Sequence, residues 1–170
     1  MDDKIKSEAS ELVGNLQMLG FTFATAESCT GGAVSHAVTS VAGCSSVMRG
    51  AVVAYHNDVK VNQLGVSSTQ LEEHGAVSGV VAEQMVRGVA RVLETDCAVA
   101  TTGIAGPGGG SFEKPVGTVW IAAYVRDEVL VKQLSLGDQG RENNVRLTVL
   151  AVIRLINEML SVLLFSKNKK

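Results

Sequence analysis

The segment DCAVATTGIAGPGGG, residues 96–110, does most to indicate the fold of this protein. Residues 96–102 form a continuous, largely apolar run, which is typical of a strand at the centre of a sheet that is covered on both faces. The next eight residues contain five glycines and one proline, which predicts a loop at the end of that strand. The sequence around this segment should therefore supply further strands and the helices that cover them.

Helical spacing of apolar residues, with glycine stop signals, predicts the helices Ile5–Leu19, Thr30–Gly43, Val59–Leu64, Ser68–Glu73, Val80–Leu93 and about Arg141–Leu164. Apolar runs predict four more strands, Phe21–Thr25, Val47–Tyr55, Val116–Val125 and Val129–Leu136. The last two flank the polar pivot Arg126-Asp127-Glu128, which indicates an antiparallel hairpin. Together these elements predict an α/β fold, a three-layer α/β/α sandwich with a mixed, mostly parallel sheet that contains an antiparallel hairpin. We expect one domain over residues 1–170, with its core at about 5–165.

Composition narrows the functional classes. With 46% hydrophobic and 19% charged residues, the chain should be soluble and globular rather than disordered. A formal charge of -2 and 4% aromatic residues give no basic field or stacking platform, so we expect no nucleic-acid partner. The apolar stretch Leu150–Phe165 is interrupted by polar residues, which argues against a membrane span.

The cysteines and the first residues of the chain indicate the cellular compartment of the protein and whether it binds a metal. Cys29, Cys44 and Cys97 lack the spacing of a metal site or an even disulfide framework, so we expect free thiols and no metal. We also expect no cofactor. The acidic start, MDDK, does not resemble a secretory signal. We therefore expect a cytoplasmic protein.

A first polar segment, TAESCTGG at residues 25–32, sets a hydroxyl and a thiol side by side at the end of a strand. Ser28 could act as a nucleophile, with the N–H groups of Thr30, Gly31 and Gly32 holding an anion at the start of a helix. Ser28 could equally be a helix cap, with glycines that only permit the turn. The segment lacks the G-x-S-x-G pattern of an α/β-hydrolase elbow.

Two more polar segments follow strand ends, where ligands gather in open α/β sheets. In the first, Lys60 could be the base for a serine if burial makes it neutral, or it could be a solvated helix residue. Tyr55 could orient that lysine or relay a proton, and Asn57 could donate to a substrate carbonyl. In the second, the loop with Gly103, Gly106 and Gly108 suits a phosphate or ribose, although it has no Walker pattern. A pair of Cys29 with His56 is also conceivable.

Several motifs in order along the chain resemble the CinA C-terminal family. They are TAESCTGG at 25–32, Y-x-N-x-x-K at 55–60, HGAVS at 74–78, TGIAGPGG at 102–109 and KPVGTVW at 114–120, within a match from about residue 5 to 160. The resemblance implies a cytoplasmic, metal-free amidohydrolase that converts nicotinamide mononucleotide to nicotinate mononucleotide and ammonia. It implies Ser28 as nucleophile and Lys60 as its base, with Tyr55 and Thr102 in support.

One departure from the family affects the phosphate contact. Family members commonly carry G-D-R-x-x-V-R before the last helix, whereas this chain has GDQGRENNVR at 137–146. We assign the phosphate contact to Arg141, with Arg146 as the competing residue. The alternatives to the amidohydrolase are a non-catalytic pyridine-nucleotide-binding or regulatory paralogue, and an amidohydrolase for another amide. We also expect a homodimer or higher homo-oligomer, because active-site loops of small α/β domains are often completed by a neighbour.

Overall fold

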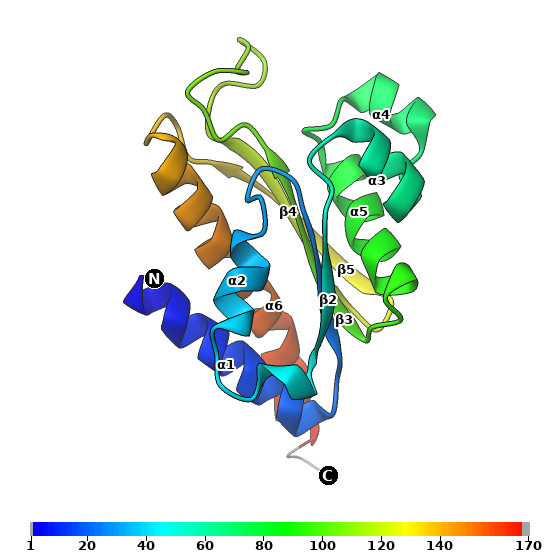
Figure 1. Cartoon of the computed structure of the whole chain (residues 1–170), viewed down its shortest axis with the longest axis vertical. Helices are drawn as coiled ribbons and strands as arrows, with labels where there is room; N and C mark the ends of the chain where they lie inside the picture. Colours follow the sequence, from blue (N-terminus) through cyan, green and yellow to red (C-terminus); the bar gives the residue numbers. More distant parts are fainter. Residues whose placement is uncertain (1, 168–170) are drawn as a thin grey trace.

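The computed structural model describes residues 2–167 and has an α/β architecture with helices on both faces of one sheet (Figure 1). Along the chain the elements are α1 (Asp3–Leu19), β1 (Phe23–Glu27), α2 (Ala33–Thr39), η1 (Cys44–Ser46), β2 (Met48–Val53), α3 (Asn57–Leu64), α4 (Ser68–His74), α5 (Gly79–Val92), β3 (Cys97–Gly103), β4 (Thr118–Val125), β5 (Glu128–Ser135) and α6 (Arg141–Lys167). The predicted sandwich is confirmed.

The five strands lie in the order β2-β1-β3-β4-β5. β1 pairs in parallel with β2 and with β3, whereas β4 is antiparallel to β3 and to β5. It follows that β4 alone runs against the other four strands, as the predicted hairpin requires. The carboxyl ends of β1, β2 and β3 therefore meet at one edge, where the three polar segments leave the sheet.

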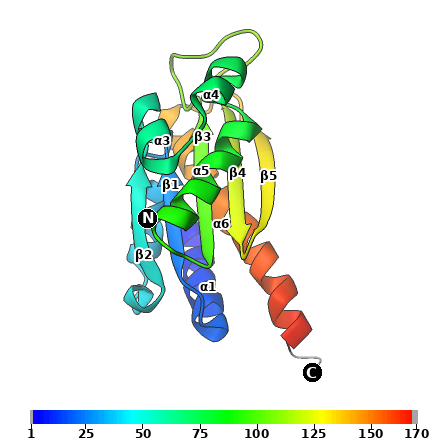
Figure 2. The ribbon, with the colours of Figure 1, turned by 90° about the vertical axis from the view of Figure 1, so that its right-hand side faces the viewer.

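The residues of β3 explain why this strand lies at the centre of the sheet. Six of its seven residues, from Cys97 to Thr102, are buried, because helices cover both faces of this strand. On one face the buried cluster includes side chains of α1, α2 and α6, and on the other the cluster is built around α5. Figure 2 shows α5 crossing the sheet, with α1 and α6 behind it. A strand buried on both faces needs the apolar run that the sequence contains.

Several element ends differ from the sequence-based expectation. The second helix was expected over Thr30–Gly43, but α2 covers only Ala33–Thr39 and a separate 3-10 turn, η1, follows. Gly31 and Gly32 have φ values of 59° and 101°, a left-handed region that glycine adopts without the Cβ penalty of other residues. The chain therefore makes a tight turn after β1 before the helix can begin.

Helix α6 is long and apolar enough to cross a membrane by length and composition alone. Half of its most apolar window is buried within the domain, where Val152, Ile153 and Ile156 are fully enclosed. These buried residues make α6 a core helix of the sandwich.

Candidate active site

Ser28 and Lys60 meet at the carboxyl edge of the sheet. Ser28 directly follows β1, and its backbone N–H donates to the carbonyl of Thr101 in β3 at 2.9 Å. Ala54 follows β2, and its N–H donates to the carbonyl of Glu27 at 2.8 Å. Lys60 comes from α3, whose first turn begins just beyond β2. The neighbouring parallel strands thus bring two residues 32 positions apart within hydrogen-bond distance.

The side chain of Lys60 is enclosed, with an exposure of 1%. Its Nζ lies 3.1 Å from Oγ of Ser28, 2.9 Å from the carbonyl oxygen of Ala54 and 3.3 Å from that of Tyr55. Burial lowers the pKa of Lys60 below its ordinary value, and among residues 2–167 no carboxylate forms a salt bridge with it. A neutral Lys60 can donate its two N–H bonds to the two carbonyls, which leaves its lone pair for the hydroxyl of Ser28.

The thiol of Cys29 is buried as well, and burial keeps it protonated. Burial raises its pKa to about 12, and the side chain is 7% exposed. A thiol with that pKa is protonated near neutral pH, whereas the thiolate is the nucleophilic form. Of the two adjacent groups in the described chain, the Ser28 hydroxyl is the one that forms a hydrogen bond with the Lys60 amine.

Glu27 is a polar residue of the site to which the sequence analysis gave no role. It is fully buried, and its carboxylate accepts five hydrogen bonds. Three come from the backbone N–H groups of Gly32, Val34 and Ser35 at the start of α2, and two from the hydroxyls of Thr25 and Thr30. Glu27 therefore satisfies the open end of α2 and holds the turn that carries Ser28. In the sequence, the signal that could have identified Glu27 is that a charged residue stands at the end of an apolar strand.

This capping changes which backbone groups remain for a ligand. The N–H of Gly32 is taken by Glu27, and that of Gly31 donates to the carbonyl of Ser28 at 3.1 Å. Within the described residues, the N–H groups of Cys29 and Thr30 have no acceptor. Both directly follow Ser28 in the turn, so they are the donors nearest Ser28 that remain for an oxyanion.

Tyr55 and Arg141 join two of the polar segments to the start of α6. Arg141 donates to the hydroxyl oxygen of Tyr55 at 2.7 Å and to the carbonyl of Gly106 at 3.0 Å. The Tyr55 hydroxyl thus contacts Arg141 rather than Lys60, and the contact of Tyr55 with Lys60 is through its backbone carbonyl. The guanidinium lies in the exposed part of the site, between the loop after β2 and the glycine loop.

The other predicted site residues lie at the same edge with different contacts. The Thr102 hydroxyl donates to the carbonyl of Ala76 at 2.8 Å, which ties β3 to the segment before α5 instead of to Ser28. Asn57 begins α3 and is exposed. Gly103 ends β3, and a Cβ there would lie 2.7 Å from Cα of Val119. Gly108 lies in the exposed part of the glycine loop, with open space around it.

Arg146, the competing phosphate ligand, forms a salt bridge with Asp2. Asn144 lies between the two arginines and is fully buried; its side-chain amide donates to the carbonyls of Ala105 and Gly137. The start of α6 is thereby fastened to the glycine loop. Of the two arginines, only Arg141 contacts the predicted site residues.

The protein is thus an α/β domain with a buried serine–lysine pair at the carboxyl edge of a mixed sheet. The chain belongs to the CinA C-terminal domain family, which it matches over residues 5–160. This confirms the family expected from the motifs.

Similar proteins agree with this assignment. A CinA-like protein of Dictyoglomus turgidum is 43% identical over 143 residues, which cover 84% of this chain and 34% of that protein. A CinA-like protein of Kosmotoga olearia is 46% identical over 137 residues, which cover 80% of this chain and 33% of that protein. The chain thus spans about a third of the length of the curated relatives that it matches.

Solved structures match over nearly the whole fold. The competence/damage inducible protein CihA from Agrobacterium tumefaciens has a TM-score of 0.86 at 43% identity, and covers 94% of this chain and 95% of its own. Competence damage-inducible protein A from Klebsiella pneumoniae has a TM-score of 0.89 at 30% identity. The match covers 92% of this chain and 97% of that one.

Proposed function

We propose that this protein is an amidohydrolase that converts nicotinamide mononucleotide to nicotinate mononucleotide and ammonia through Ser28 and Lys60. The observation that carries the proposal is the buried Lys60 amine 3.1 Å from the Ser28 hydroxyl, with a lowered pKa and no salt-bridge partner in the described chain. A serine hydroxyl needs an adjacent base, and a desolvated lysine can supply one near neutral pH. The choice of substrate rests on family resemblance.

The first half of the reaction forms an ester. The Ser28 oxygen attacks the carboxamide carbon, its proton passes to Nζ of Lys60, and the carbonyl oxygen becomes an oxyanion. The N–H groups of Cys29 and Thr30 are the donors available for that oxyanion. When the carbon–nitrogen bond breaks, the lysine proton goes to the amide nitrogen, which leaves as ammonia.

The second half regenerates the enzyme. Water attacks the ester carbon, Lys60 takes a proton from the water, and the carbon–oxygen bond to Ser28 breaks. The proton returns to the Ser28 oxygen, and the carboxylic acid that is released gives its own proton to solvent and leaves as a carboxylate. The positive pyridinium ring of the substrate draws electrons from the carboxamide and so favours both attacks.

Arg141 is the group that we assign to the substrate phosphate, together with the glycine loop. Its guanidinium holds Tyr55 and the carbonyl of Gly106, so it is placed between two of the loops around Ser28. Arginine can bind two phosphate oxygens at once, which fixes the orientation of a nucleotide. We place this reaction in the cytoplasm, as a step of pyridine-nucleotide salvage.

Ammonia release from nicotinamide mononucleotide tests the proposal. Ser28→Ala and Lys60→Met should each lower kcat by at least about 100-fold, because either change removes the nucleophile or its base. Cys29→Ala and Lys6→Met are matched controls, since one alters the neighbouring side chain and the other an exposed lysine on α1. Full activity of Ser28→Ala would refute the assignment.

Two other results would point to the alternatives. Binding of nicotinamide mononucleotide by the wild type without ammonia release would favour a regulatory, non-catalytic protein. Equal kcat/KM for nicotinamide riboside, which lacks the phosphate, would favour an amidohydrolase for another substrate.

A further inference from the structure

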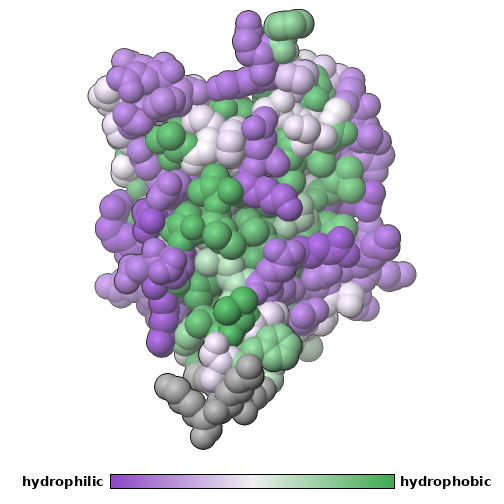
Figure 3. Space-filling view, turned by 180° about the vertical axis from the view of Figure 1, so that it is seen from behind, coloured by the Kyte–Doolittle hydropathy of each residue, from purple (hydrophilic) through white to green (hydrophobic). Residues whose placement is uncertain are grey.

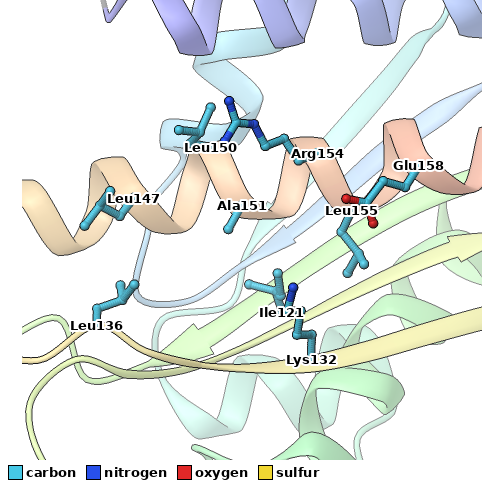
Figure 4. Close-up of a pocket in the computed structure, with 9 residues that line it drawn as sticks. All are labelled: Ile121, Lys132, Leu136, Leu147, Leu150, Ala151, Arg154, Leu155 and Glu158. Atoms are coloured by element: carbon cyan, nitrogen blue, oxygen red, sulfur yellow. The ribbon is translucent and has the colours of Figure 1, made fainter.

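A groove lies between the edge strand β5 and helix α6, and it is lined by none of the candidate site residues (Figure 4). Helix α6 packs on β3 and β4 and leaves part of β5 uncovered. Leu136 on the β5 side and Leu147, Ala151 and Leu155 on α6 line the groove. An adjoining cavity, lined by Leu130, Val162 and Leu163, continues it toward the end of α6.

Large apolar side chains are exposed along this groove. Leu130 is 49% exposed, Val162 67% and Leu163 37%, and Phe165 lies three residues beyond Val162 with 71% exposed. Figure 3, which shows the molecule from behind, has a continuous apolar area on this side between polar margins. Contiguous apolar area of this kind marks an interaction surface, whereas scattered single residues do not.

The charges on the two walls are opposite. Lys132 projects from β5 and Glu158 from α6, and neither forms a salt bridge within residues 2–167 (Figure 4). Arg154, the other charged residue of the groove, is paired with Glu8 of α1. The groove therefore offers one unpaired cation on one wall and one unpaired anion on the other.

We propose that this groove is the interface of a symmetric homodimer, in which Lys132 of each copy pairs with Glu158 of the other. A twofold interface joins the same patch on both subunits, so a patch that carries unpaired charges of both signs can be complementary to itself. The pairing would place the exposed leucines and valine of both copies together, as the apolar centre of the interface. Because Glu158 and Glu128 lie beside the apolar residues, the groove suits a second copy better than an anionic membrane surface.

A charge-swap experiment tests the dimer. Sedimentation velocity over a concentration series should show a dimer for the wild type. Lys132→Glu and Glu158→Lys should each raise the dissociation constant at least about ten-fold, because each sets like charges opposite one another. The double variant with both changes should restore the dimer, which a merely destabilising substitution could not do. Circular dichroism verifies that each variant is folded.

Substitutions of exposed apolar residues complete the test. Val162→Asp should also produce monomers, whereas Val92→Asp on α5, 47% exposed and outside the groove, should leave the dimer intact. A wild type that stays monomeric at about 100 µM would overturn the proposal, as would a dimer that none of the groove changes weakens. A monomer that sediments with vesicles of phosphatidylcholine and phosphatidylglycerol would instead assign the groove to a membrane surface.

Discussion

The Nζ atom of Lys60 lies 3.1 Å from the Oγ atom of Ser28, inside a region where the lysine is 1% exposed. Two backbone carbonyls, those of Ala54 and Tyr55, receive the other hydrogen bonds of the amine. The ability of Lys60 to act as a base toward Ser28 depends on burial, because desolvation disfavours the charged form of the lysine.

The pH dependence of activity should follow Lys60. Because the neutral amine is the active form, kcat/KM should rise with pH through a midpoint below 10.5, the ordinary lysine value, since burial lowers this pKa. The stability of wild type relative to Lys60→Met should also rise with pH toward the ordinary lysine pKa, because in that window the unfolded state binds more protons. Steady-state rates and thermal unfolding over a pH series measure both. An activity that falls with pH over this range contradicts the role.

The Cys29 thiol should be dispensable and unreactive. Cys29→Ala should keep kcat within about three-fold of wild type, because a thiol with a pKa of about 12 is protonated at neutral pH. In the folded protein, iodoacetamide should label Cys44, which is only partly buried, before the buried Cys29 and Cys97. Mass spectrometry of the peptides gives the order of labelling. Loss of activity in a folded Cys29→Ala protein would move the nucleophile to the thiol.

Glu27→Gln should destabilise the protein by about 2–4 kcal/mol, because the amide sets an N–H donor against donors that the carboxylate now accepts. kcat should fall as well, since the turn that carries Ser28 loses its anchor. Glu72→Gln, on the exposed face of α4, is the control and should change stability by less than about 0.5 kcal/mol. Urea unfolding provides the comparison, and equal midpoints for the two variants would show that the buried carboxylate is not needed.

Substitutions of the two arginines at the start of α6 should have different effects on KM. Arg141→Gln should raise KM for nicotinamide mononucleotide about ten- to one-hundred-fold, as expected for a lost charge-assisted phosphate contact. Arg146→Gln should leave KM unchanged, because its guanidinium is paired with Asp2. Kinetics with the mononucleotide and with the riboside test the assignment. For the riboside, Arg141→Gln should have little effect, and the reverse pattern of the two variants would assign the phosphate to Arg146.

A pair of glycine substitutions should reveal how closely α3 approaches α5. A Cβ at Gly88 in α5 would lie 2.1 Å from the backbone oxygen of Leu64, which is one turn after Lys60 in α3. Gly88→Ala should therefore lower stability by more than about 2 kcal/mol and displace Lys60, with a fall in kcat. Gly14→Ala in α1 has open space and should stabilise by up to about 1 kcal/mol. Thermal unfolding distinguishes them, and equal effects would contradict the close approach.

Much of the fold was predictable because the local patterns are unambiguous. The run 96–102 predicted the central strand, and the pivot 126–128 predicted the hairpin of β4 and β5. The start of α2 was not predictable in this way, because Glu27 binds N–H groups five to eight residues later, and this contact depends on the turn at Gly31 and Gly32. Helix propensity and spacing hold no information on such a contact.

The sequence by itself determined the strand and helix pattern, the family motifs and a short set of polar residues that includes Ser28 and Lys60. Only the tertiary structure decided which of those residues touch, because the Ser28–Lys60 contact is made across the adjacent ends of β1 and β2. It also decided between Arg141 and Arg146 as the arginine near the loops, and it enclosed the lysine away from water. The physical reason is that burial and contacts between distant segments arise from packing, and the same lysine on an open helix would be an ordinary cation.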